Sequence, residues 1–203
     1  MRKILLIVAT FLLVVACSKD DVNEPKDGNQ LEKNFPFLKI GNSWTYNFYE
    51  VDLDNGSIDS NTFTLSLNRK DTMSFGYDTT YTVYYVTDGL KEDIFFIAAN
   101  DSTLIGGISF WKPRIEFPDY LKSYTVGQSW GYYPNPDDYV SKTVISINET
   151  VTVEAGTFHN CIKIKRIRED EDPNPSFIWL RNDIGVIKIE NNNRTVELKS
   201  KNF

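Results

Sequence analysis

The chain has 203 residues, of which 28 are Asp or Glu and 22 are Lys or Arg, so its formal net charge is −6. An acidic surface repels nucleic acid phosphates and anionic lipid headgroups, which excludes both as expected partners. The chain holds one histidine, His159, which excludes a histidine-rich metal site.

The N-terminus has the pattern of an export signal. Arg2 and Lys3 precede a thirteen-residue apolar run, Ile4 to Ala16, that ends in small residues. This basic, apolar, small-residue order is typical of a signal peptide. Thirteen residues fall well short of the roughly 20 that a helix needs to cross a bilayer. We therefore predict that residues 1–16 are a signal peptide that is removed.

The apolar run stops at a cysteine. The stretch Val14–Val15–Ala16–Cys17 resembles the lipobox of bacterial lipoproteins. The resemblance implies cleavage before Cys17 and acylation of Cys17 by fatty chains such as palmitate. Several chains anchor a protein stably, whereas a single chain binds a membrane only weakly. The expected partner of this segment is therefore the membrane, reached through a lipid anchor on Cys17.

The residues after the cysteine carry a second resemblance. Ser18–Lys19–Asp20–Asp21 is similar to the sorting tract of surface-exposed lipoproteins of the Bacteroidetes. That resemblance implies an outer-membrane protein facing the cell surface, and a domain facing the periplasm is the alternative. Removal of residues 1–16 takes two basic residues with it and leaves 187 residues with a net charge of −8.

Residues 17–34 have the composition of a flexible tether, with Pro25, Gly28 and no aromatic residue. A single domain is expected from Phe35 to residue 203, a length at which β proteins commonly keep one core.

Strand patterns dominate this domain. Apolar and polar residues alternate in the stretches 62–68 and 195–199, and in 145–153 the apolar members are Ile145, Ile147, Val151 and Val153. Alternation with a period of two predicts strands with one buried face. No window after residue 16 has a convincing helical period. We predict an all-β, antiparallel, barrel-like or sandwich domain of about ten strands.

The domain contains an internal repeat. IGNSWTY, Ile40 to Tyr46, recurs as VGQSWGY, Val126 to Tyr132, at an offset of 86. This predicts two related halves, about 35–122 and 123–203, that fold together. Gly41 and Gly127 are expected to turn the chain with positive φ, and Trp44 and Trp130 to be buried anchors whose indole N–H needs a partner.

A further resemblance covers most of residues 35–200. The stretches Thr150 to Ile167 and Phe177 to Glu190 resemble a motif pair in secreted and lipid-anchored bacterial proteins of uncharacterised function, with the turn Ala155–Gly156–Thr157–Phe158 as the most specific part. The resemblance implies a β-rich lipoprotein and brings no catalytic residues or cofactor.

The common catalytic motifs do not occur in the sequence. There is no Gly-x-Ser-x-Gly nucleophile motif to partner His159 and no phosphate-binding loop. A glycan hydrolase with paired carboxylates stays open as an alternative, because Glu149 lies in phase with the apolar residues of 145–153 and an unpaired buried acid has a raised pKa. Cys161, inside an apolar strand, is expected to be a buried hydrophobic residue rather than a reactive thiol.

Two groups of residues are candidate binding sites. The stretch Asp52 to Asp59 offers Asp52, Asp54 and Asp59 as calcium ligands. The alternative is an ordinary hairpin turn without a metal, which the pair Asn55–Gly56 favours. Aromatic residues lie beside prolines in the loop-like stretches 109–121 and 131–139, where they suit a sugar ring or a protein partner or else fold back over the domain; they are Trp111, Tyr132, Tyr133 and Tyr139.

The sequence therefore predicts an outer-membrane lipoprotein with a non-catalytic binding or structural β domain. Its ligand is unknown, and no cofactor other than calcium is expected. The alternatives are the glycan hydrolase and an accessory subunit of a surface complex, which would expose a contiguous apolar patch.

Overall fold

The computed structural model describes residues 28–75, 79–87, 92–100, 102–106, 119–135, 138–168 and 172–203. The predicted signal peptide, Cys17 and Trp111 lie outside these residues. No helix in the described ranges is long and apolar enough to span a membrane.

The described residues form one short helix and twelve strands. In chain order these are α1 Gly28–Asn34, β1 Ser43–Val51, β2 Ile58–Phe75, β3 Thr79–Thr87, β4 Glu92–Asn100, β5 Thr103–Gly106, β6 Tyr120–Leu121, β7 Ser129–Asn135, β8 Asp138–Val153, β9 Gly156–Arg168, β10 Asp172–Arg181, β11 Gly185–Glu190 and β12 Arg194–Lys201. The predicted all-β antiparallel class is confirmed, with twelve strands in place of about ten.

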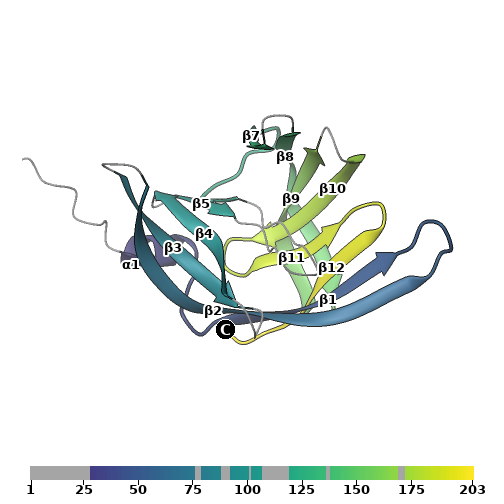
Figure 1. Ribbon diagram of the computed structural model, residues 1–203, viewed down its shortest axis with the longest axis horizontal. Helices are drawn as coiled ribbons and strands as arrows, with labels where there is room; N and C mark the ends of the chain where they lie inside the picture. The colour runs from purple at the N-terminus through teal and green to yellow at the C-terminus, as the bar shows by residue number, and fades with distance from the viewer. Residues whose placement is uncertain are drawn as a thin grey trace, which may run out of the picture.

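All twelve strands belong to one sheet. Its order is β6-β5-β4-β3-β2-β1-β12-β11-β10-β9-β8-β7, so two six-stranded meanders, β1–β6 and β7–β12, meet where β1 pairs with β12. Strands β6 and β7 end the order, and the described sheet is therefore open. In Figure 1, β1 and β2 run along the bottom as one long hairpin whose turn projects past β12, and β7 to β10 rise above it.

The two copies of the repeat have the same local structure. Gly41 and Gly127 have φ of 93° and 86°, a region that costs other residues about 1–2 kcal/mol. The N–H of Gly41 donates to the carbonyl of Leu67, and the N–H of Gly127 donates to that of Val144. Each glycine therefore begins a hairpin in the same way, β1–β2 in the first half and β7–β8 in the second.

The buried face of β8 changes along the strand, and the prediction for residues 145–153 is wrong. Ile145 and Ile147 are 38% and 36% exposed, whereas Val151 and Val153 are buried. The β8–β9 ladder is irregular at three places, between Val144 and Val151. An extra residue on one strand shifts the alternation of its side chains by one, so a single period cannot describe the whole strand.

The helix α1 belongs to the folded domain. Its Leu31 is 4% exposed and lies in the core together with Phe35, Phe37 and Leu38. Lys70 of β2 donates to Glu32 of α1 at 2.7 Å. The folded domain therefore includes Gly28–Asn34, which lie within the segment 17–34 that the sequence predicts to be a tether.

Aromatic rings fill the core between the first meander and the start of β11. Phe37 contacts Trp44 and Tyr120 with ring centroids 6.0 and 4.9 Å apart. The indole N–H of Trp44 donates to the Ile184 carbonyl at 2.7 Å. The predicted role of Trp44 as a buried anchor with a hydrogen-bonded N–H is confirmed.

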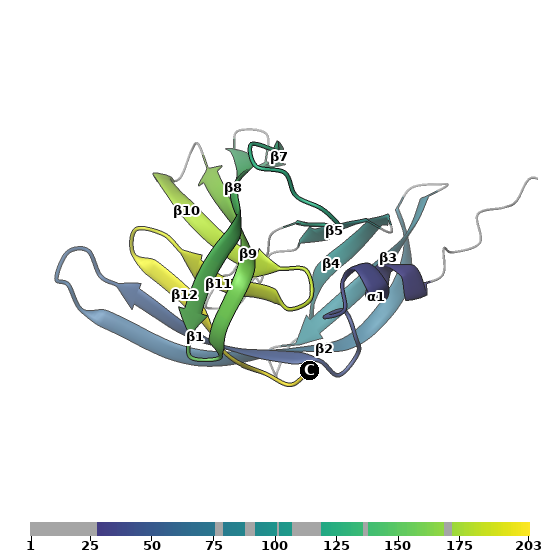
Figure 2. The ribbon, with the colours of Figure 1, turned by 180° about the vertical axis from the view of Figure 1, so that it is seen from behind.

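The turn between β8 and β9, which carries the most specific motif of the sequence, packs back on the sheet. Figure 2 shows the β8–β9 hairpin crossing in front of β11 and β12. The N–H of Ala155 donates to the Leu198 carbonyl at 3.2 Å, and Asn47 of β1 donates to the Glu154 carboxylate at 2.7 Å. Phe158 is buried behind this turn. The motif therefore holds the tip of the second meander against β12 and β1.

Candidate functional site

A row of lysines and aromatic rings crosses strands β9, β10 and β11. The register pairs Lys163 with Trp179 and Lys165 with Phe177 on β9 and β10, and Trp179 with Lys188 on β10 and β11. We call these five residues the lysine–aromatic row. Ile164 and Ile178, their neighbours along the strands, are buried. Side chains alternate between the two faces of a sheet, so the row lies on the face opposite these core residues.

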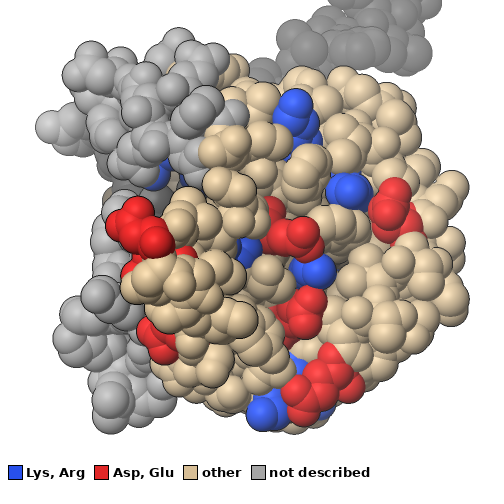
Figure 3. Space-filling view, turned by 90° about the vertical axis from the view of Figure 1, so that its right-hand side faces the viewer, with Lys and Arg blue, Asp and Glu red and all other residues tan. Residues whose placement is uncertain are grey.

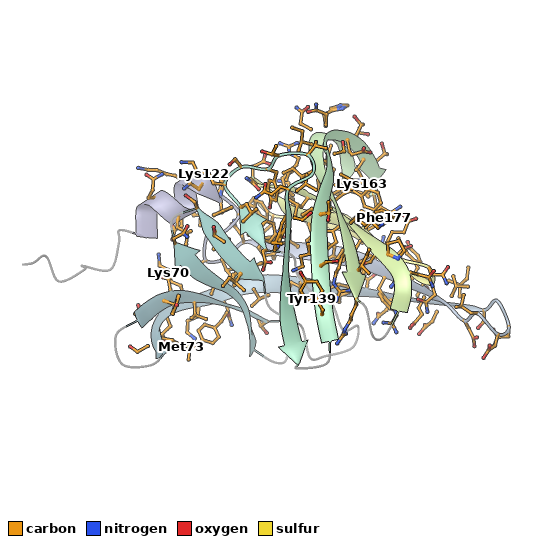
Figure 4. All side chains as sticks on the ribbon, turned by 90° about the horizontal axis from the view of Figure 1, so that it is seen from above. Lys70, Met73, Lys122, Tyr139, Lys163 and Phe177 are labelled. Atoms are coloured by element: carbon orange, nitrogen blue, oxygen red, sulfur yellow. The ribbon has the colours of Figure 1, made fainter. Side chains whose placement is uncertain are left out.

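Two lysines of the row, Lys163 and Lys188, lie over its rings. The Lys163 ammonium lies 4.8 Å from the ring centre of Phe177 and 4.6 Å from that of Trp179, within the range of cation–π attraction. The rings themselves are 6.2 Å apart and both are half-buried. Figure 4 shows Lys163 and Phe177 close together, away from the labelled Tyr139.

Lys188 and Lys163 differ in their charge partners. Lys188 is 23% exposed and donates to Glu190 at 2.7 Å and to Glu197 at 3.1 Å. Burial lowers the pKa of Lys188, but the hydrogen bonds to the two carboxylates outweigh that effect, and its pKa is raised overall. Lys163 and Lys165 form no ion pair with any acid in the described residues. Their positive charges are therefore available to an anion.

Three of the four predicted aromatic ligand residues lie on strands rather than in loops. Tyr132 and Tyr133 belong to β7 and Tyr139 to β8, and the β7–β8 ladder is irregular only between Tyr132 and Asn135, where Pro134 lies. Tyr139 is half-buried, and its ring lies so close to Gly131 that any side chain at residue 131 would collide with it. The loop placement is wrong, and ligand binding by these residues stays a prediction.

The predicted calcium ligands surround an open hollow of about 470 Å³ at the end of the β1–β2 hairpin. The Asp52 carboxylate accepts from the N–H of Asp54 at 2.9 Å and from the Asn55 amide at 2.8 Å. In the described part of the chain, no three His, Cys, Asp or Glu side chains are placed to hold a metal ion. These hydrogen bonds within the hairpin turn satisfy the Asp52 carboxylate without a metal. Calcium binding at Asp52, Asp54 and Asp59 stays a prediction.

A buried charged cluster joins the two ends of the sheet, and the sequence analysis missed it. Asp119, next to β6, accepts from Trp130 of β7 at 2.8 Å and from the ammonium of Lys142 of β8 at 3.3 Å. Its other oxygen accepts from the N–H of Gly106 at 3.1 Å. The side chains of Lys142 and Asp119 are 2% and 14% exposed. We call this group the Asp119 clasp, because it links β5 and β6 to β7 and β8 without backbone pairing.

The other candidate residues have structural surroundings. Glu149 is half-buried and pairs across the β8–β9 ladder with the buried Cys161, and its role in a glycan hydrolase stays a prediction. His159 is exposed and its Nδ1 lies 3.1 Å from the Thr150 hydroxyl. Cys161 is fully buried, and burial raises the pKa of its thiol. The prediction that Cys161 is a buried hydrophobic residue is confirmed.

Comparison with known proteins gives a structural likeness. No protein-family model and no curated protein sequence matches the chain. The fold is similar to the crystal structure of a protein described as a "putative lipoprotein" from Parabacteroides distasonis ATCC 8503, with 13% sequence identity and a TM-score of 0.40. The match covers 81% of this chain and 96% of that one. A likeness of this size carries no conclusion about function.

Proposed function

We propose that this chain is a lipid-anchored protein of the bacterial outer membrane whose β domain serves as a non-catalytic binding module facing the cell surface. The observation that carries the proposal is the cysteine at the end of the apolar run, with Val14–Val15–Ala16 before it and Ser18–Lys19–Asp20–Asp21 after it.

The position of the folded domain is consistent with an anchor at Cys17. The domain begins by Gly28, eleven residues after Cys17. A chain of that length spans at most about 40 Å when fully extended. Acylation of Cys17 would thus keep the β domain beside the membrane.

Binding rather than catalysis is favoured by the lysine–aromatic row. Its side chains project from three paired strands, which hold them in fixed positions, and two of its lysines have no acidic partner in the described residues. A surface of this kind recognises a ligand without needing a nucleophile or a general base.

The anchor is tested by cell fractionation of the native chain and a Cys17→Ala variant. We expect the native protein in the outer-membrane fraction and the variant in a soluble fraction. The orientation is tested by adding protease to intact cells, which should digest a domain that faces outward. A native protein that stays soluble would refute the anchor, and a membrane-bound protein that resists protease until the cells are opened would place the domain in the periplasm.

A further inference from the structure

We propose that the lysine–aromatic row binds an anionic glycan, with the sugar rings against Phe177 and Trp179 and the carboxylate or sulfate groups against Lys163 and Lys165. The inference rests on the proposed function, because it assigns a ligand class to the proposed binding module. The site it names is separate from the four aromatic residues predicted from the sequence.

The row carries positive charge on an acidic chain. The mature chain carries a net charge of −8, and Figure 3 shows acidic and basic side chains interspersed over one face without a large field of either sign. Within such a surface, two adjacent lysines on one strand without acidic partners form a local positive site. An anion at this site would complete the charge pairing that the described residues do not provide.

The two rings of the row lie side by side on one face of β10. Phe177 and Trp179 are two residues apart on β10, so both project from the same face, and their ring centres lie 6.2 Å apart at a tilt of 46°. Each ring is half-buried and therefore also keeps part of its surface in solvent. The apolar faces of sugar rings pack on aromatic rings of this kind, whereas a simple inorganic anion makes no apolar contact with them.

Polar residues pair with the row on both neighbouring strands. On β8, Thr143 pairs with Lys165 and Ser146 pairs with Lys163, and on β11 Glu190 pairs with Phe177. These residues flank the row on both sides with hydroxyl and carboxylate groups. Sugar hydroxyls need donors and acceptors of this kind beside a stacking surface.

The row also retains its geometry without a ligand. The β9–β10 pairing is regular from Ile162 to Arg166, and Lys188, held by Glu190 and Glu197, lies 5.8 Å from the Trp179 ring centre. The side chains therefore lose little freedom on binding, which favours affinity.

The test measures binding to the mature chain as purified from cells, whether or not Cys17 is acylated, in a neutral detergent by isothermal titration calorimetry. The probes are a galacturonate hexamer, a sulfated heparin hexasaccharide, a neutral glucose hexamer and a glutamate hexapeptide. We expect both anionic sugars to bind more tightly than the neutral sugar and the peptide. The tighter of the two anionic sugars shows whether carboxylate or sulfate is preferred.

Variants assign the site. Trp179→Ala should weaken binding of the preferred sugar about tenfold or more, as expected for an aromatic anchor. Lys163→Gln with Lys165→Gln should weaken it about tenfold and reduce its salt dependence, because the variant removes two charge-assisted contacts. This lysine variant leaves the core untouched, so it keeps the test valid if Trp179→Ala does not fold. The matched controls Lys39→Gln and Tyr49→Ala, on other elements, should leave affinity unchanged.

Several results would overturn the proposal. One is the absence of binding to both anionic sugars. Another is binding that none of the row variants alters. Equal binding of the glutamate hexapeptide that is lost in Trp179→Ala would assign the row to a protein partner instead. None of these results depends on the lipid at Cys17, because anchoring is measured separately by fractionation, so the failure of one proposal is distinguishable from the failure of the other.

Discussion

Replacement of Asp119 by alanine tests whether the Asp119 clasp holds the two ends of the open sheet together. The substitution removes the carboxylate that accepts from Trp130, Lys142 and Gly106. No backbone hydrogen bond of the ladder connects β6 to β7. The side chains of the Asp119 clasp therefore help to hold β5 and β6 against β7 and β8.

The magnitude follows from the burial of the pair. Removal of one partner of a buried ion pair costs about 3–5 kcal/mol, because the other charge loses a compensating partner in the interior. Lys142 is 2% exposed, but Asp119 is 14% exposed and admits some water. We therefore expect Asp119→Ala to lower the free energy of unfolding by about 3 kcal/mol, at the lower end of that range. The double variant Asp119→Leu with Lys142→Met removes both charges and should lose only about 1 kcal/mol, mainly from the unpaired Trp130 N–H.

The assay is equilibrium unfolding in urea of residues 18–203, followed by circular dichroism. The difference between the double variant and the sum of its two single variants, Asp119→Leu and Lys142→Met, measures the coupling of the two residues. If Asp119→Ala costs less than about 1 kcal/mol, or if the double variant is as unstable as the two single variants added together, the clasp does not stabilise the fold as argued here.

Four further predictions concern stability. Tyr84 has a buried hydroxyl with no hydrogen-bond partner among the described residues, and burial raises its pKa to about 12; Tyr84→Phe should therefore raise the free energy of unfolding by about 1 kcal/mol at pH 7. A raised tyrosine pKa gives stability that is present below pH 10 and lost as the pH rises from 10 to 12, so urea midpoints should fall more in the native chain than in Tyr84→Phe over that interval. Gly41→Ala and Gly127→Ala should each cost about 1–2 kcal/mol, because both positions have positive φ and open space around the missing Cβ; unequal urea midpoints would contradict the equivalence of the two turns. For the turn around Asp52, the melting temperature should be the same with calcium and with a chelator, and a rise of several degrees with calcium would show a metal site there.

Much of the fold could be predicted from local patterns. Val196 and Leu198 alternate with polar neighbours in the sequence and are buried as expected, because β12 pairs in regular register with β1 from Arg194 to Leu198. The repeat correctly predicted the positive φ of Gly41 and Gly127, because two similar seven-residue stretches form the same turn. Local patterns are reliable where the ladder is regular.

The errors and omissions arise from contacts that are distant in the sequence. The buried face of β8 changes because of bulges against β9, and no alternation within residues 145–153 shows where an extra residue lies. Asp119 and Lys142 meet only because the sheet brings its ends together, so neither residue is unusual in the sequence. The lysine–aromatic row was missed for a similar reason, since it forms only when β9 pairs with β10.

The most direct test of the lipid-anchored assignment is mass spectrometry of the native mature protein. We predict an N-terminal peptide that begins at Cys17 and carries the added mass of several fatty acyl chains. An N-terminal peptide that still contains residues 1–16, or one that begins at Cys17 with an unmodified thiol, would contradict the assignment.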